Sequence, residues 1–415
     1  MESSTLLFII LLILSVNFML EQWLDYINMR RQNATLPDEL MGIYDEEKYA
    51  QSIAYQKTQT RFSFITSSIS FIVFFIVVFT GFFGILDEWL RVFIDNEIAL
   101  ALAFFAILYF VSDWLSLPFQ LYSTFVIEER FGFNKITPRI FILDKLKGYL
   151  VTLLLGGGVL FIFIWLILTI GKDFWLYFWI ISAILMVLVN MLYTSVIVPI
   201  FNKLTPLPEG ELKEAIEEYG RKVGFPIDNI FVIDGSKRSS KANAFFSGIG
   251  KRKKVVLYDT LIEGHSKEEL VAVLAHEVGH YKKKHILTGM ILSVLQVGIM
   301  LFILSFLIFN PTLSEAMGAT QLSVAINLVV FGILFSPISM ITGLFMNIMS
   351  RKNEFEADAY ATLTYDGAAL QMALKKLSVN NLSNLLPHPL YVFFHYSHPP
   401  LLQRLQAIAA VKTTQ

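Results

Sequence analysis

Two histidines four residues apart, with a glutamate directly after the first, are the strongest candidates for chemistry in this sequence: His276, Glu277 and His280. On a helix, residues i and i+4 project from one face, so both imidazoles point to the same place. The pattern His-Glu-x-x-His on a helix is typical of a zinc site in which the glutamate acts on metal-bound water. The alternative is a pair of surface histidines beside an unrelated glutamate. A capping box of Ser266 and Glu269, which opens the predicted helix, favours the zinc site.

A tetrahedral catalytic zinc needs a third protein ligand and keeps one position for water. His285 lies on a different face of the predicted helix, so we expect the third ligand to come from a second helix. The segment 351–360 offers Glu354, and Asp358, four residues on, shares its face. We predict Glu354 as the third metal ligand and Asp358 as the acceptor of a proton from a ligand imidazole. The alternative for this segment is a solvated, charged start of a helix.

The composition indicates that membrane helices must position these residues. Hydrophobic residues make up 55% of the 415-residue chain and charged residues only 16%, whereas a soluble domain has about 25% charged residues. Seven apolar stretches are long enough to cross a bilayer, which takes roughly 20 residues. They cover 3–20, 62–86, 98–127 (interrupted by Asp113), 148–171, 174–202, 285–314 and 316–350. We predict an all-α polytopic membrane protein with seven transmembrane helices; a soluble protein with a very apolar core is the alternative.

The positive charges between these stretches predict the orientation. Four alternate segments hold 31 of the 33 Lys and Arg residues, and the intervening ones hold two. The basic segments are 21–61, 119–147, 201–284 and the tail after 350; the others are 87–97, 171–173 and 310–320. Because basic loops stay on the cytoplasmic side, the N-terminus is expected outside and the C-terminus inside. The first stretch lacks a basic start and a cleavage site, which favours a retained anchor over a signal peptide.

We divide the chain into four parts. They are 1–202 (transmembrane helices 1–5 with cytoplasmic loops), 203–284 (a cytoplasmic protease segment with the zinc-motif helix), 285–350 (transmembrane helices 6 and 7) and 351–415 (a C-terminal protease segment with the third ligand). The second part should hold a helix from Glu211 and short strands over 229–234, 243–248 and 254–258. No proline or glycine pair separates the zinc-motif helix from the sixth span, which allows the two to be continuous. A net charge of −1 predicts no nucleic-acid partner, and the absence of cysteine excludes disulfides.

Four separated motifs carry a resemblance to a known family. They are His276–His280, Glu354–Asp358, the segment 395–405 (His-Tyr-Ser-His-Pro-Pro-Leu-Leu-Gln-Arg-Leu) and the segment 128–135 (Glu-Glu-Arg-Phe-Gly-Phe-Asn-Lys). Together with the seven-span layout they resemble the integral-membrane zinc endopeptidases that act as type I CAAX prenyl proteases. The resemblance covers nearly the whole chain. It implies a gluzincin-like protease domain with a small β element on the cytoplasmic side, and one zinc ion per chain.

The resemblance also implies roles for further residues. His398 would stabilise the tetrahedral intermediate, and Arg404 would help to order the site. Asn243 and Ala244 would lie on an edge strand that holds the substrate backbone by β-augmentation. From the residues alone, a simple alternative for His398 is a loop histidine that hydrogen-bonds to the backbone.

These residues together predict metal-assisted hydrolysis of peptide bonds. Glu277 takes a proton from water and passes it to the leaving amine, while His398 donates to the developing oxyanion. CAAX-type removal of a C-terminal tripeptide from a prenylated protein is the function we expect. One alternative is a general quality-control protease for membrane proteins, with no prenyl requirement. Another is a transporter or channel with a structural metal, against which Glu277 beside the ligand argues.

Both ligand-bearing helices adjoin predicted spans, which places the site at the face of the bilayer. Such a position suits a prenylated or membrane-associated peptide or protein as substrate, with the lipid bilayer as the other partner. The chain lacks a long extra loop and a dilysine-type tail, which favours a bacterial or otherwise compact member. The expected location is the bacterial cytoplasmic membrane or, in a eukaryote, the endoplasmic reticulum or nuclear membrane. The residues leave the oligomeric state open.

Overall fold

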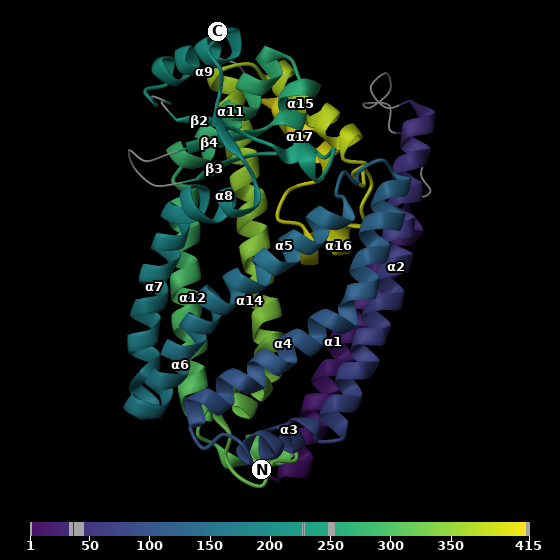
Figure 1. Cartoon of the computed structure of the whole chain (residues 1–415). Helices are drawn as coiled ribbons and strands as arrows, with labels where there is room; N and C mark the ends of the chain where they lie inside the picture. Colours follow the sequence, from purple (N-terminus) through teal and green to yellow (C-terminus); the bar gives the residue numbers. More distant parts are fainter. Residues whose placement is uncertain are drawn as a thin grey trace.

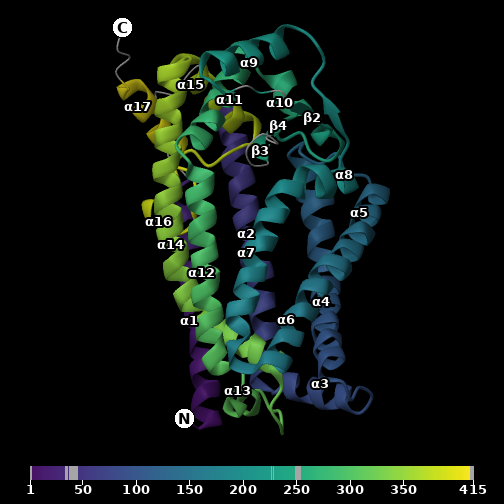
Figure 2. The same cartoon turned by 90° about the vertical axis from the view of Figure 1, so that its left-hand side faces the viewer.

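A bundle of long helices carries a smaller helical cap with one sheet (Figures 1 and 2). The computed structural model describes residues 2–32, 36, 45–225, 227, 229–247 and 254–411. The cap contains the short strands and the helices of the zinc motif, and it lies over one end of the long helices (Figure 1).

Six helical segments in these described ranges are long and apolar enough to cross a membrane. They are α1 (Ser3–Arg31), α2 (Glu46–Phe79), α4 with its π-helical end (Glu97–Glu128), the composite segment Pro138–Phe201, α12 (His285–Leu307) and α14 (Val324–Thr364). The composite segment has 64 residues. It turns at Gly171, whose φ of 72° suits glycine, and α6 (Gly157–Ile170) and α7 (Phe174–Leu192) pack together on either side of the turn. Two crossings within this segment are consistent with the seven that the sequence predicts.

Short elements complete the membrane part. They are α3 (Phe82–Arg91), α5 (Pro138–Val151), α8 (Val198–Phe201), α13 (Pro311–Ala316) and the π-helical turns η2 (Ser123–Glu128), η3 (Thr152–Gly156) and η5 (Tyr193–Ile197). The predicted second span, 62–86, includes a break at Gly81 between α2 and α3. Asp113 of α4 is not isolated, because Lys145 Nζ lies 2.7 Å from both of its carboxylate oxygens.

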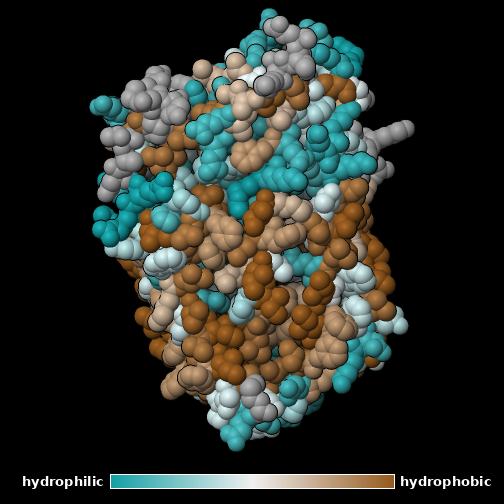
Figure 3. Space-filling view, turned by 180° about the vertical axis from the view of Figure 1, so that it is seen from behind, coloured by the Kyte–Doolittle hydropathy of each residue, from teal (hydrophilic) through white to brown (hydrophobic). Residues whose placement is uncertain are grey.

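The outer surface of the bundle is apolar. Large side chains such as Phe8, Ile72, Leu153 and Ile341 are more than half exposed. From behind, hydrophobic residues dominate the middle and lower part of the molecule, with hydrophilic residues above and below them (Figure 3). Such a belt is stable in hydrocarbon, where helices satisfy their own backbone hydrogen bonds.

A four-stranded sheet lies in the cap. Its order is β1-β2-β4-β3, with β1 (Leu204–Pro206) and β3 (Ala244–Ser247) at the two edges and β2 (Ile230–Ile233) parallel to β4 (Lys254–Tyr258) between them. The three predicted strands are confirmed within a residue or two, whereas β1 was not predicted. The predicted edge position of the strand that follows Asn243 is also observed. Residue 248, the last of the predicted strand over 243–248, lies outside the described residues.

Helix α11 (Lys267–Lys282) is the centre of the cap and carries the zinc motif. The predicted capping box of Ser266 and Glu269 is present. Buried residues 270–272, 274 and 275 join an apolar core with α9 (Glu211–Lys222), α10 (Asp259–Gly264), α15 (Gly367–Asn380) and α17 (Leu401–Ala410). Gly279 lets α11 approach α14 closely, because a Cβ there would lie 3.1 Å from Ala357 Cα.

The zinc-motif helix and the sixth span are not one helix. Helix α11 ends at Lys282 and α12 begins at His285, with Lys284 between them in the left-handed region at φ 61°. The left-handed conformation is uncommon for a residue with a Cβ, and neither glycine nor proline announces it in the sequence. The break redirects the chain, so the helical geometry used to place His285 does not apply.

Candidate active site

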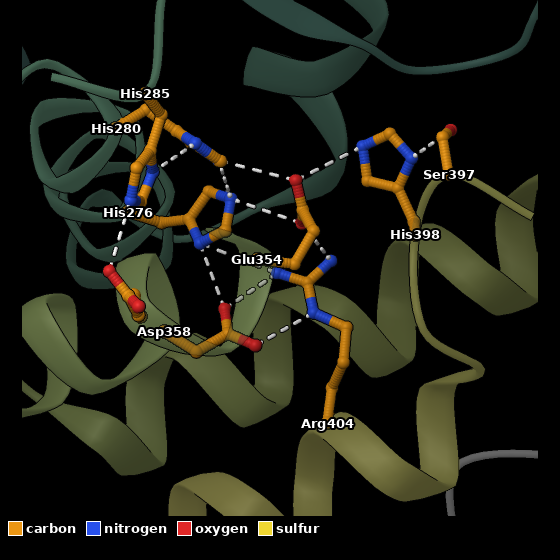
Figure 4. A network of polar contacts seen from close by, with 9 residues as sticks. His276, His280, His285, Glu354, Asp358, Ser397, His398 and Arg404 are labelled. Atoms are coloured by element: carbon orange, nitrogen blue, oxygen red, sulfur yellow. Dashed lines mark hydrogen bonds and ion pairs between the residues drawn. The ribbon is translucent and has the colours of Figure 1, made fainter. Parts of the chain in front are cut away.

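Three side chains from two helices converge in a cavity of about 310 Å³ in the cap. His276 and His280 come from α11, and Glu354 comes from the C-terminal half of α14 (Figure 4). The Nε2 atoms of the two histidines are 3.2 Å apart. Glu354 Oε1 lies 3.2 Å from His280 Nε2, and Glu354 Oε2 lies 3.5 Å from His276 Nε2.

These three distances suit a shared metal ion. Ligand atoms about 2.0–2.2 Å from an ion at tetrahedral angles lie about 3.3–3.6 Å from one another. Glu354 Oε2 is buried and makes no hydrogen bond, although Arg404 NH1 is 3.2 Å away. The structure therefore brings together the three residues that the sequence predicts as ligands.

A buried ion pair, formed by Asp358 and Arg404, contacts His276 on the side away from the metal cluster. Asp358 Oδ1 lies 2.8 Å from His276 Nδ1, on the side of the ring opposite the cluster. Arg404 from α17 donates to both oxygens of Asp358, from Nε at 2.8 Å and from NH2 at 2.6 Å. A proton on Nδ1 that is donated to Asp358 leaves the lone pair of Nε2 for a metal. Asp358 thus contacts a predicted ligand and Arg404 contacts Asp358, while their roles stay predictions.

His280 has a partner that sequence reasoning missed. Its Nδ1 lies 3.1 Å from Nδ1 of His285 (Figure 4). His285 Nε2 lies 3.2 Å from Glu356 Oε2. Only one pattern of protons satisfies both contacts with a metal on Nε2 of His280. His280 donates from Nδ1 to His285, and His285 donates from Nε2 to Glu356. The left-handed turn at Lys284 makes this contact possible.

Glu277 and His398 lie on the wall of the same cavity. Burial raises the pKa of Glu277, and the neighbouring His276 and His280 counteract part of that rise. A carboxylate with a raised pKa is a better proton acceptor, which suits a general base. The exposed His398 enters from the segment before α17, with Nε2 3.3 Å from Glu354 Oε1 and Nδ1 3.0 Å from Ser397 Oγ.

The sequence matches known families over nearly its whole length. Residues 25–203 match the family described as CAAX prenyl protease N-terminal, five membrane helices, and residues 206–412 match Peptidase family M48. CAAX prenyl protease 1 homolog of Arabidopsis thaliana is 37% identical, over 95% of this chain and 96% of the relative. The chain belongs to peptidase family M48. It is a membrane metalloprotease of the CAAX prenyl protease type.

Other relatives of this M48 peptidase agree. CAAX prenyl protease 1 of Saccharomyces cerevisiae is 34% identical, over 94% of this chain and 92% of the relative. The Homo sapiens homolog is 33% identical, over 91% and 89%. The crystal structure of S. mikatae Ste24p superposes with a TM-score of 0.92 at 32% identity, over 97% of this chain and 99% of that one. The predicted family and fold class are confirmed.

In this M48 peptidase, Asn243 and Ala244 line the cavity of the metal cluster. Ala244 begins β3 and pairs with Leu257 of β4. The side chain of Asn243 accepts a hydrogen bond from the backbone of Ala244, and its carbonyl accepts one from Tyr258. Among the described strands, β3 pairs only with β4, so its other edge is available to an extended peptide.

Proposed function

We propose that this M48 peptidase is a zinc endopeptidase that removes the C-terminal tripeptide from prenylated proteins. The observation that carries the proposal is the cluster of His276, His280 and Glu354, which lies beside Glu277 in one cavity of the cap. Two nitrogens and a carboxylate, with space for water in the adjoining cavity, form the ligand set of a catalytic zinc site. The relatives, whose names describe CAAX prenyl proteases, support the substrate class.

The roles of the surrounding residues follow from their positions. When bound, zinc supplies a Lewis acid that polarises the scissile carbonyl and acidifies water. Glu277 accepts the proton of the attacking water and delivers it to the leaving amine. His398 donates from Nε2 to the carbonyl oxygen as negative charge develops there. Asp358 and Arg404 hold His276 in the tautomer that presents Nε2 to the metal.

An apolar cavity next to the site supports a lipid-bearing substrate. It has a volume of about 740 Å³ and lies between α6, α7 and α12. Phe245 and Phe246, which directly follow Ala244 on β3, form part of its wall. A peptide bound along the edge of β3 can therefore place an isoprenoid chain in this cavity while its scissile bond faces the metal.

Matched peptides test the proposal. The purified protein, loaded with zinc, should cleave a farnesylated peptide and release its last three residues, and a chelator should abolish cleavage. Glu277→Gln should retain zinc and lower kcat by about 10²–10⁴-fold. Equal cleavage of farnesylated and unmodified peptides would identify a general protease of membrane proteins instead. Zinc without any hydrolysis would contradict the proposal and favour a structural metal in a transporter or channel.

We also propose the orientation in which the cap faces the cytoplasm. The basic segments of the chain, including most of the cap, then lie inside, as the charge distribution favours. In a eukaryotic cell the membrane would be that of the endoplasmic reticulum or nucleus, and in a bacterium the cytoplasmic membrane. Protease protection of tags at the two termini tests this orientation.

A further inference from the structure

Three cavities lie in order along residues 241–246, which include the start of strand β3. The apolar cavity has Phe245 and Phe246 in its wall. The cavity of the metal cluster has Asn243 and Ala244. A third cavity, of about 690 Å³, has Lys241. The second and third adjoin each other, because His398 and Arg404 line both.

The third cavity differs from the first in polarity and charge. Its wall contains the amides of Gln56, Asn381 and Asn384 and the hydroxyl of Tyr55. Lys241 and Arg404 are its charged residues, and no carboxylate occurs among the fifteen described residues that line it. Arg404 is already paired with Asp358 and Glu354, so Lys241 is the cation left for a ligand. A cavity with cationic and amide walls suits an anionic, peptide-like ligand.

Lys241 is held in place with part of its donor capacity unused. Its Nζ donates to Tyr55 Oη at 2.9 Å and to Glu128 Oε2 at 3.0 Å, and it lies 4.3 Å from the ring centre of Phe133. An ammonium group has three N–H donors, so one stays available. Glu128 also accepts from Tyr55 and Gln59, so its charge is shared among three donors.

The order of the cavities fixes the direction of the substrate. In a prenylated C-terminus, the lipid sits on the residue before the scissile bond and the free carboxylate lies three residues after it. With the lipid beside Phe245 and Phe246, the tripeptide must run towards Lys241, antiparallel to β3. Three extended residues span about 10 Å, and the three residues from Ala244 back to Lys241 span at most about the same length.

We propose that the third cavity binds the C-terminal tripeptide and that Lys241 recognises its terminal carboxylate. This inference rests on the proposed function. It explains how the enzyme would measure three residues from the end of a chain: the metal cluster sets the cleaved bond, and the ammonium group sets the position of the carboxylate. Lys241 is thus a residue of substrate specificity.

Two farnesylated peptides of the same sequence test the inference, one with a free C-terminal carboxylate and one with a C-terminal amide. The parent enzyme should cleave the acid with a kcat/KM about ten- to a hundredfold higher than the amide. Lys241→Gln should reduce this preference to within about threefold, chiefly through KM for the acid, and Lys241→Arg should restore most of it. Lys237→Gln is the matched control, because Lys237 is exposed and does not line the cavity.

The ratio of acid to amide is informative even if Lys241→Gln folds poorly, because a loss of folded enzyme lowers both rates equally. Equal cleavage of acid and amide by the parent enzyme would overturn the inference and leave the proposed function intact. An unchanged preference in Lys241→Gln would overturn the role of Lys241. Failure of the parent to cleave either farnesylated peptide would instead contradict the proposed function.

Discussion

The two histidines of the metal cluster are held in different ways. The side chain of His276 is 9% exposed and contacts Asp358, which is 1% exposed and bound by a buried arginine. The side chain of His280 is 18% exposed and contacts the imidazole of His285. His285 in turn contacts Glu356, whose side chain is 40% exposed. One ligand is thus oriented by a buried ion pair and the other by a chain of hydrogen bonds that ends near solvent. The first arrangement joins α14 to α17 through buried charges, whereas the second joins α12 to α14 through a contact with a partly exposed carboxylate.

Of the substitutions that separate the two arrangements, removal of the Asp358 side chain should have the largest effect on stability and zinc affinity. Asp358→Ala leaves Arg404 buried without its bidentate partner, and such a loss typically costs about 3–5 kcal/mol of folding free energy. It also removes the acceptor that orients His276, so zinc affinity should fall about 10–100-fold. Thermal unfolding of the metal-free protein in detergent and competition with a zinc chelator measure the two effects. An unchanged unfolding midpoint would show that the buried pair does not stabilise the fold.

Substitution of His285 should affect the metal and leave the fold nearly unchanged. His285→Ala removes the acceptor for Nδ1 of His280, and we expect about a tenfold loss of zinc affinity. His285→Asn, whose Oδ1 can occupy the place of Nδ1, should recover much of it. The metal-free unfolding midpoint should change little in either variant.

The visible spectrum of the cobalt-substituted protein supplies a second measurement, because it reports ligand geometry directly. Asparagine should restore the parent spectrum and alanine should not. Equal spectra and equal affinities for the alanine and asparagine variants would exclude a positioning role for His285.

The sequence predicts one side of this site far better than the other. His276, His280 and Asp358 obey regular helical spacing, and the capping box marks the start of α11, so local rules suffice. Glu354 required a different argument, the need for a third metal ligand from a second helix. His285 was missed because its contact depends on Lys284 in a left-handed conformation, which costs energy and has no sequence signal.

The fold also contains parts that local sequence patterns predict and parts that they do not. The membrane helices follow from long apolar stretches, and β2, β3 and β4 follow from β-branched and aromatic runs between turns. Strand β1 was missed because three residues that end in Pro206 carry almost no strand signal, and only the pairing with β2 defines them. The cavities along β3 are beyond the reach of sequence patterns, because they are bounded by helices distant in the chain.

The smallest effect on zinc affinity is expected at Glu356, the last residue of the hydrogen bonds that run from His280 through His285. Glu356→Gln keeps an oxygen that can accept a hydrogen bond from His285 Nε2, and it removes the negative charge of the carboxylate. Because Glu356 is 40% exposed, water screens that charge, and its interaction with His285 is worth about 1 kcal/mol or less. Zinc affinity should therefore fall by no more than about fivefold, well short of the effect at Asp358. Affinity measured at low and high salt sharpens the test, since a screened charge predicts that the small difference shrinks as salt rises. A loss as large as that of Asp358→Ala would mean that both histidines depend on a carboxylate charge, and the contrast between the two sides of the site would disappear.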